Sequence, residues 1–134
     1  MMRILDAMNT LAHIITELKS GVALAVALGD FLDAFYRAPD TALLADEPPL
    51  MEGKSGAAIN AYLAGVAEHL AREYGLDIPG WVFDRQRYLR WPKFGNESAA
   101  LRATLLSESP PAFRSRNIFI TANALERASR RRVA

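Results

Sequence analysis

The strongest helical pattern in the chain is Ala57-Ala58-Ile59-Asn60-Ala61-Tyr62-Leu63-Ala64-Gly65-Val66-Ala67-Glu68-His69-Leu70-Ala71-Arg72-Glu73-Tyr74. Its large apolar side chains recur at three- and four-residue steps, the period of one face of an α-helix. They are Ile59, Leu63, Val66, Leu70 and Tyr74. We expect Ser55 to cap the start of this helix and Gly75 to end it in the left-handed conformation.

Two more amphipathic helices are predicted before this stretch. An apolar stripe from Ile4 to Leu18 predicts an additional N-terminal helix within residues 4–20. A second stripe predicts a helix over residues 22–37, which Pro39 stops because proline lacks an amide donor and clashes with the preceding turn. An acidic connector over residues 38–56 follows, with a short helical turn at 41–45 that Asp40 can cap.

Beyond Pro79 the periodicity is weaker and the predicted elements are shorter. Trp81-Val82-Phe83 is interpreted as a short strand or an apolar loop, and Ile118-Phe119-Ile120 as a β-prone run. The helical elements predicted here are one or two turns within 84–91, a helix over 98–107, a turn capped by Ser109 with Pro111 at its first position, and a last helix over 122–130 capped by Thr121. Residues 130–134 are predicted to be a frayed basic tail.

These elements predict one all-α domain over residues 1–134, with five or six helices in an orthogonal or bundle-like array. A two-stranded scrap, with Trp81–Phe83 beside Ile118–Ile120, is a minor alternative. The length of 134 residues and the apolar fraction of 51% suit a globular domain that buries a core.

Composition also limits the cellular setting. The sequence contains no cysteine, so it has no disulfide and no thiolate chemistry. The longest apolar run, Val22 to Leu28, is far shorter than the roughly 20 residues of a membrane span. We therefore expect a cytoplasmic protein without a membrane partner.

The net charge of +1 conceals an uneven distribution. Residues 1–67 carry four basic and eight acidic side chains, a net of −4, whereas residues 68–134 carry twelve basic and seven acidic ones, a net of +5. The two halves can neutralise each other within the fold, which is the favoured interpretation, or the basic half can bind an acidic partner.

The sequence contains no recognisable catalytic motif. An enzymatic activity is therefore uncertain, and a non-enzymatic role is favoured. His69 and Glu73 share a helix face and could supply two metal ligands, but a metal site needs at least three protein ligands. The favoured interpretation is a solvent-exposed helix face that carries an ion pair between Glu68 and Arg72. Gly53-Lys54-Ser55 lacks the first glycine of a phosphate-binding loop, and no serine lies in a nucleophile-elbow pattern. The sequence predicts no cofactor and no metal site.

Two segments are candidates for contact with a partner. Residues 81–94 interleave five aromatic with four basic side chains, which can either stack nucleic-acid bases or fill an irregular core with the arginines in water. Farther along, Arg114 and Arg116 flank Ser115. With the terminal arginines they can bind an anion, or they can cap helix C-termini or pair with the acidic first half. The candidate partner- or anion-binding residues are Arg114, Arg116, Asn117, Phe119, Trp91, Lys93 and Phe94.

Residues 30–128 also resemble an uncharacterised bacterial domain family. The resemblance rests on Asp30-Phe31-Leu32-Asp33-Ala34-Phe35-Tyr36-Arg37-Ala38-Pro39-Asp40, on Ile78-Pro79-Gly80-Trp81 and above all on Glu108-Ser109-Pro110-Pro111-Ala112-Phe113-Arg114-Ser115-Arg116-Asn117-Ile118-Phe119-Ile120. Similar domains often follow a helix-turn-helix domain or stand alone in gene pairs that look like toxin–antitoxin modules. The resemblance implies no catalytic residues.

Three hypotheses follow from the sequence. The first is a protein-interaction or regulatory module, an antitoxin-like partner, with the helix over residues 4–18 as an alternative homodimer interface. The second is a nucleic-acid-binding protein that uses the basic half. The third is a helical domain with a ligand pocket or an active site, for which the first suspects are His69, Glu73, Tyr88 and Arg114.

Overall fold

A computed structural model describes residues 8–95 and 99–127 of the chain. Within these ranges the fold is mostly α-helical, with α2 (His13–Lys19), α3 (Leu24–Arg37), α4 (Ala42–Ala45), α5 (Gly53–Glu73), α6 (Ala99–Glu108) and α7 (Pro111–Arg114). Two 3-10 helices, η1 (Gly80–Phe83) and η2 (Arg85–Arg87), and two strands, β1 (Lys93–Phe94) and β2 (Ile118–Phe119), complete the described elements. The predicted all-α class with five or six helices and a two-stranded scrap is confirmed.

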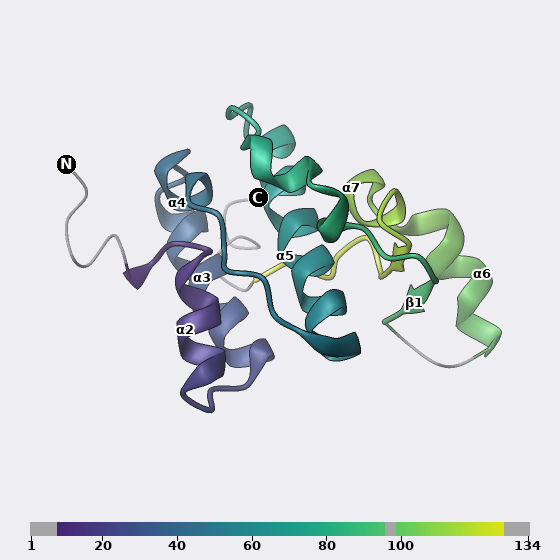
Figure 1. The fold of residues 1–134 in the computed structure, drawn as a ribbon. Helices are drawn as coiled ribbons and strands as arrows, with labels where there is room; N and C mark the ends of the chain where they lie inside the picture. The colour runs from purple at the N-terminus through teal and green to yellow at the C-terminus, as the bar shows by residue number, and fades with distance from the viewer. Residues whose placement is uncertain (1–7, 96–98, 128–134) are drawn as a thin grey trace.

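Helix α5 lies at the centre of the molecule, with α2, α3 and α4 on one side and α6, α7 and the strands on the other (Figure 1). It is buried on more than one face because small residues, among them Ala61, Ala64 and Ala67, lie between the large apolar ones. Helix α7 and both 3-10 helices pack directly against it. A central position of this kind requires a helix that is apolar around most of its circumference.

The ends of α5 confirm one expectation and correct another. Gly75 has a φ of +66° and ends the helix as predicted. The helix begins at Gly53, however, so Ser55 lies inside it and is not the N-cap; Glu52 holds that position. The chain before the helix is instead held by Asn60, whose side-chain amide accepts from the Met51 N–H at 2.8 Å and donates to the Met51 carbonyl at 2.9 Å.

The N-terminal helices pack together and contribute to one apolar core. Helix α3 ends at Arg37 as predicted, and the side chain of Asp40 caps α4 by accepting from the Ala42 N–H at 2.9 Å. Helix α2 begins only at His13, because the Leu11 N–H donates to the Leu43 carbonyl and the Thr10 hydroxyl accepts from the His13 N–H. The predicted continuous helix over 4–18 is therefore interrupted before His13, and residues 1–7 lie outside the described ranges.

The predicted N-terminal dimer face is also affected by this packing. Leu11 and Ile15 of the stripe are buried in the shared core, whereas Met8 is 54% exposed. The homodimer alternative through this helix stays a prediction.

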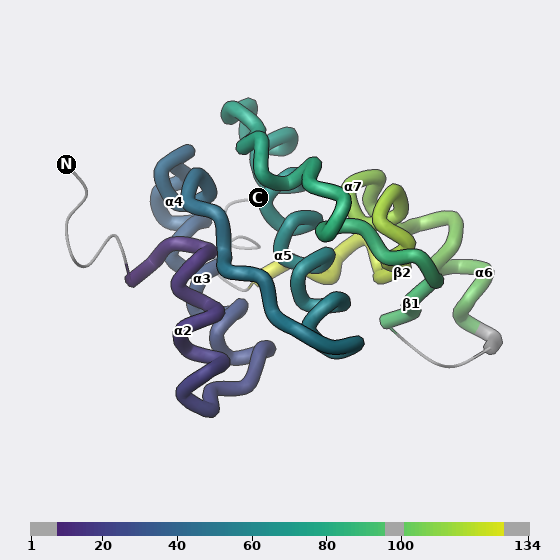
Figure 2. Tube along the Cα trace, viewed as in Figure 1, coloured from purple at the N-terminus to yellow at the C-terminus, as the bar shows by residue number. Residues whose placement is uncertain are grey.

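The structure contains a two-stranded sheet as predicted, but one of its strands comes from a segment that was not predicted. Strand β2 pairs in parallel with Lys93–Phe94 and not with Trp81–Phe83, which forms the 3-10 helix η1 (Figure 2). The indole N–H of Trp81 donates to the Leu44 carbonyl at 3.0 Å, and this contact holds η1 against the N-terminal part of the fold.

Two helix N-caps predicted in the C-terminal part, Ser109 and Thr121, do not act as caps in the structure. Helix α7 has Pro111 at its first position as expected, but Pro110 is its N-cap. Ser109 instead links α6 to the chain after β2: its hydroxyl accepts from the Ile120 N–H at 2.8 Å and lies 2.6 Å from the Leu105 carbonyl oxygen. Residues 121–125 form turns, so no helix follows Thr121 up to residue 127, and the predicted frayed tail over 130–134 lies outside the described ranges.

In the part of the chain that the structure describes, no helix combines the length and the apolar content that crossing a bilayer requires.

Candidate functional site

The parallel strand pair brings together the two segments that the sequence analysis selected for partner contact. Lys93 is in register with Ile118 and Phe94 with Phe119, and the rings of Phe94 and Phe119 stack with their centroids 5.2 Å apart. The Lys93 N–H donates to the Asn117 carbonyl at 2.8 Å. Residues 91–94 and 114–119 are thus neighbours in space, although α6 and α7 separate them in sequence.

Asn117 sets the geometry of this junction. Its φ of 64° is in the left-handed region, which asparagine tolerates better than most residues. The same residue donates from its side-chain amide to the Leu89 carbonyl at 2.8 Å. Asn117 therefore acts as a turn that positions the start of β2 beside the chain that leads into β1.

Arg116 lies inside the molecule, where it cannot meet a partner. The side chain has 0% exposure. Its guanidinium donates to the Glu68 carboxylate at 2.6 Å and to the carbonyls of Ala112 and Val82, both at 2.7 Å, and it lies over the ring of Tyr88 at 4.6 Å. Arg116 thus has a structural role, but its carboxylate partner, Glu68, belongs to the basic half of the chain and not to the acidic first half.

A second buried arginine, Arg87, went unrecognised in the sequence. Its guanidinium donates to the Pro48 carbonyl, to the Asn60 carbonyl at 3.3 Å and to the Glu47 carboxylate at 3.1 Å, and it lies 4.8 Å from the centre of the Trp81 ring. The interpretation that all arginines of 81–94 face water is therefore wrong for Arg87. Nothing in the local pattern distinguishes it from the exposed Arg85 and Arg90.

The exposed members of the candidate set lie around Trp91. The Trp91 side chain is 71% exposed and has the guanidinium of Arg90 over its ring at 5.5 Å. Phe94 is half-buried, with the Arg102 guanidinium over its ring at 5.1 Å. Two leucines of α6 are also exposed. We name the four side chains of these two cation–ring contacts the Trp91 surface: Arg90, Trp91, Phe94 and Arg102.

The remaining candidates differ in their exposure. Arg114 is exposed at the end of α7, and Asn117 is half-buried. Phe119 is buried under Phe94, so it supports that ring and has little surface of its own. Lys93 is exposed, but it belongs to the opposite face of the strand pair, because side chains alternate between faces along a strand.

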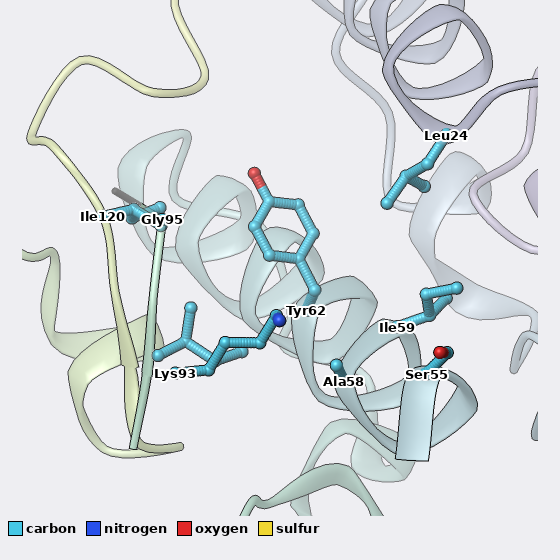
Figure 3. A pocket seen from close by; sticks show the side chains of 9 residues that line it. Leu24, Ser55, Ala58, Ile59, Tyr62, Lys93, Gly95 and Ile120 are labelled. Atoms are coloured by element: carbon cyan, nitrogen blue, oxygen red, sulfur yellow. The ribbon is translucent and has the colours of Figure 1, made fainter. Parts of the chain in front are cut away.

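That opposite face lines a hollow. Lys93, Gly95, Ile118 and Ile120 form one wall, and the first half of α5 forms another with Ser55, Ala58, Ile59 and Tyr62 (Figure 3). Leu24 at the start of α3 completes the lining. We name this cavity of about 360 Å³ the Tyr62 pocket. No local pattern in the sequence indicates this pocket, because its residues come from four separate segments.

The candidate active-site residues named from the sequence do not lie together at this pocket. His69 pairs with Glu73 at 3.0 Å on α5, as their spacing predicts, and Tyr88 packs on Arg116. Neither these three side chains nor Arg114 line the Tyr62 pocket. Nowhere in residues 8–95 and 99–127 do three or more histidine, aspartate or glutamate side chains gather into a potential metal site.

Comparison with known proteins gives no match to a family model, to a curated protein or to a solved structure. The resemblance to the bacterial domain family therefore stays a prediction. Inference about function rests on the geometry of the Trp91 surface and the Tyr62 pocket.

Proposed function

We propose that this protein is a non-enzymatic interaction module that binds a protein partner through the Trp91 surface. The observation that supports this most directly is the 71% exposure of Trp91, whose ring has the guanidinium of Arg90 over it at 5.5 Å. Leu101 and Leu106 of α6 are also exposed, at 44% and 48%.

The composition of the surface supports a protein partner. Tryptophan, phenylalanine and arginine are enriched at protein–protein interfaces, and tryptophan and arginine provide most of the residues whose truncation costs the most binding energy. Here Arg90 and Arg102 each lie over an aromatic ring, so their positions are fixed before a partner binds. Side chains that are ordered in advance lose less conformational entropy on binding.

The partner and the cellular setting are part of the same proposal. The sequence resemblance favours a regulatory, antitoxin-like role, in which the partner is a toxin-like nucleotidyltransferase or nuclease encoded by a neighbouring gene. The absence of cysteine agrees with a cytoplasmic location. Expression of both neighbouring genes together, followed by purification through a tag on this chain, tests whether the two proteins form a complex.

A site-specific crosslinking experiment tests the surface itself. A photoreactive phenylalanine replaces Trp91 in cells of the native host, and in a matched control it replaces Val26, an apolar residue of α3 with 56% exposure. We expect discrete protein adducts from position 91 that are absent from position 26. Identical adducts from both positions would contradict the proposal.

Affinity measurements with the purified partner complete the test. Trp91→Ala is expected to weaken binding about tenfold or more, the effect of losing about 1.4 kcal/mol at an interface centre. Phe83→Ala is the control, because Phe83 is an aromatic residue of η1 with 51% exposure. Adducts that nuclease digestion removes, with binding that weakens steeply as salt is added, would instead support the nucleic-acid alternative.

A further inference from the structure

We propose that the Tyr62 pocket binds a small carboxylate with a short hydrocarbon tail. This goes beyond the interaction proposed above, since it uses the opposite face of the strand pair and a different set of side chains.

The size of the pocket indicates a small molecule. Ligand pockets in proteins are concave and usually measure about 300–1,000 Å³. The cavity of about 360 Å³ lies at the lower end of that range. With roughly 30 Å³ for each water-sized group, it holds about a dozen non-hydrogen atoms.

The walls favour a hydrocarbon tail. Ile59, Ile118 and Ile120 come from α5 and from the strand pair, and Leu24 faces them from the start of α3 (Figure 3). Removal of one methylene from water into such surroundings strengthens binding about fourfold. An apolar tail therefore gains affinity for as long as each added carbon still enters the pocket.

The polar groups favour an anionic head. Lys93 leaves the strand pair in the direction of α5 (Figure 3), and it takes part in none of the ion pairs between described residues. No aspartate or glutamate is among the described lining residues, so a cationic head would meet only Lys93. A carboxylate can accept charge-assisted hydrogen bonds from such an ammonium group.

Two hydroxyl groups also line the pocket, away from the Lys93 ammonium group (Figure 3). The Tyr62 hydroxyl points into the open space and has no hydrogen-bond partner among the residues that the structure describes (Figure 3). Burial raises the pKa of Tyr62, so its phenol stays protonated at neutral pH and can donate to a carboxylate oxygen. Ser55, in the first turn of α5, provides another hydroxyl at the rim.

A neighbouring hollow is less suited to this ligand. Leu24 and Tyr62 line both cavities, but the second one also has Glu126 and Arg127 in its wall. There the Glu126 carboxylate offsets the charge of Arg127, which is already paired with Asp33, whereas the described lining of the Tyr62 pocket has Lys93 and no carboxylate. The carboxylate is therefore assigned to the end of the Tyr62 pocket that holds Lys93.

Calorimetric titration of the full chain with octanoate, octan-1-ol and octylammonium tests the choice of head group. We expect octanoate to bind at least fivefold more tightly than either of the others. In a series from hexanoate to decanoate, affinity should rise about fourfold per methylene and then level off once the pocket is full. Failure of all three head groups to bind, or equal binding of the alcohol and the acid, would overturn the proposal.

Variants locate the site. Lys93→Gln should weaken octanoate binding about tenfold and leave octan-1-ol within twofold, and Tyr62→Phe should weaken octanoate about threefold. Arg90→Gln is the matched control, because it removes an exposed charge three residues away that does not line the pocket. Equal effects of Lys93→Gln and Arg90→Gln on octanoate binding would refute the assignment. It would also be refuted if an apolar tripeptide with a free carboxylate bound more tightly than decanoate.

One further variant separates this inference from the proposed function. Trp91→Ala should leave octanoate binding within twofold while it weakens partner binding about tenfold or more. Loss of octanoate binding in Trp91→Ala would contradict the independence of the two sites.

Discussion

Two buried arginines connect the loops of this protein to its central helix. Arg87 and Arg116 have no exposed surface, yet each is paired with a carboxylate and lies against an aromatic ring. Removal of a charge from water is costly, and only several well-placed hydrogen bonds offset it. Because carbonyls of Val82, Ala112, Pro48 and Asn60 accept those bonds, each guanidinium joins several segments at one point.

Replacement of Glu68 tests this role. Glu68→Gln leaves the buried guanidinium of Arg116 without its counter-charge, and the loss of one partner of a buried pair typically costs about 3–5 kcal/mol. We expect a decrease of about 3 kcal/mol in the free energy of unfolding, measured by urea denaturation at pH 7. The matched control is Glu73→Gln on the same helix, where the partly exposed pair with His69 predicts a change under about 1 kcal/mol. Equal effects of the two substitutions would contradict the prediction.

The same carboxylate predicts how stability depends on pH. Burial alone would raise the pKa of Glu68, but hydrogen bonds and charge from Arg116 and Arg72 outweigh it and lower the pKa below 4.5. A lowered pKa in the folded state means that the stabilisation is complete above about pH 4.5 and is lost as the pH falls through the folded value. Asp33 shifts in the same direction, because of its hydrogen bonds from Arg127.

We therefore expect the difference in unfolding free energy between the wild type and Glu68→Gln to be constant from pH 7 to pH 5 and to shrink below pH 4.5. Urea denaturation at a series of pH values measures this difference. A difference that stays the same down to pH 3 would argue against a charged Glu68 as the partner of Arg116.

At the scale of elements, the closest approach is that of α7 to α5. A Cβ atom added at Gly65 would lie 2.6 Å from the Phe113 ring, so only glycine lets this ring reach the helix. Alanine normally stabilises a helix by about 1 kcal/mol relative to glycine. Overpacking at a buried contact costs about 1–3 kcal/mol and acts against that gain.

Gly65→Ala is accordingly expected to lower the free energy of unfolding by about 1 kcal/mol, as measured by thermal or urea denaturation. Gly80→Ala is the control, since a Cβ there would meet no atom within 4 Å and the change should stay within about 0.5 kcal/mol. A stabilised Gly65→Ala variant would show that Phe113 moves aside at little cost.

A single hydroxyl joins α6 to the chain beyond β2. The Ser109 hydroxyl is buried and accepts from the Ile120 N–H, so Ser109→Ala leaves that N–H without an acceptor. An unsatisfied buried donor costs about 1–3 kcal/mol, and we expect a loss of about 2 kcal/mol in urea denaturation. Ser107→Ala, which removes an exposed hydroxyl two residues earlier, should change stability by less than about 0.5 kcal/mol.

At the scale of the whole molecule, contacts cross between the acidic and the basic half. Arg127 pairs with Asp33 at 2.9 Å, and Arg87 pairs with Glu47 at 3.1 Å. The Tyr36 hydroxyl donates to the Leu125 carbonyl at 2.8 Å. These contacts account for part of the charge asymmetry as neutralisation within the fold. Residues such as Arg90 and Arg114 remain exposed.

Because the two halves interlock, we expect them to unfold together. Trp81 is held by its bond to Leu44, whereas Trp91 is largely exposed, so fluorescence of a Trp91→Phe variant reports the environment of Trp81. Its urea transition should coincide with the loss of helical circular dichroism at 222 nm, the sign of a two-state process. Separate midpoints for the two signals would show that the chain holds more than one cooperative unit.

Local sequence patterns were enough to predict the helical class, the end of α3 and the glycine that ends α5, because apolar periodicity, proline and left-handed glycine act within a few residues. The identity of the buried arginines, the partner segment of β2 and the position of the Tyr62 pocket emerge only in the folded chain. The physical reason is that burial of a charge or pairing of a two-residue strand depends on partners far away in the sequence. Arg87 and Arg90 have similar local surroundings in the sequence, but only Arg87 meets a carboxylate, two carbonyls and an aromatic ring in the folded chain.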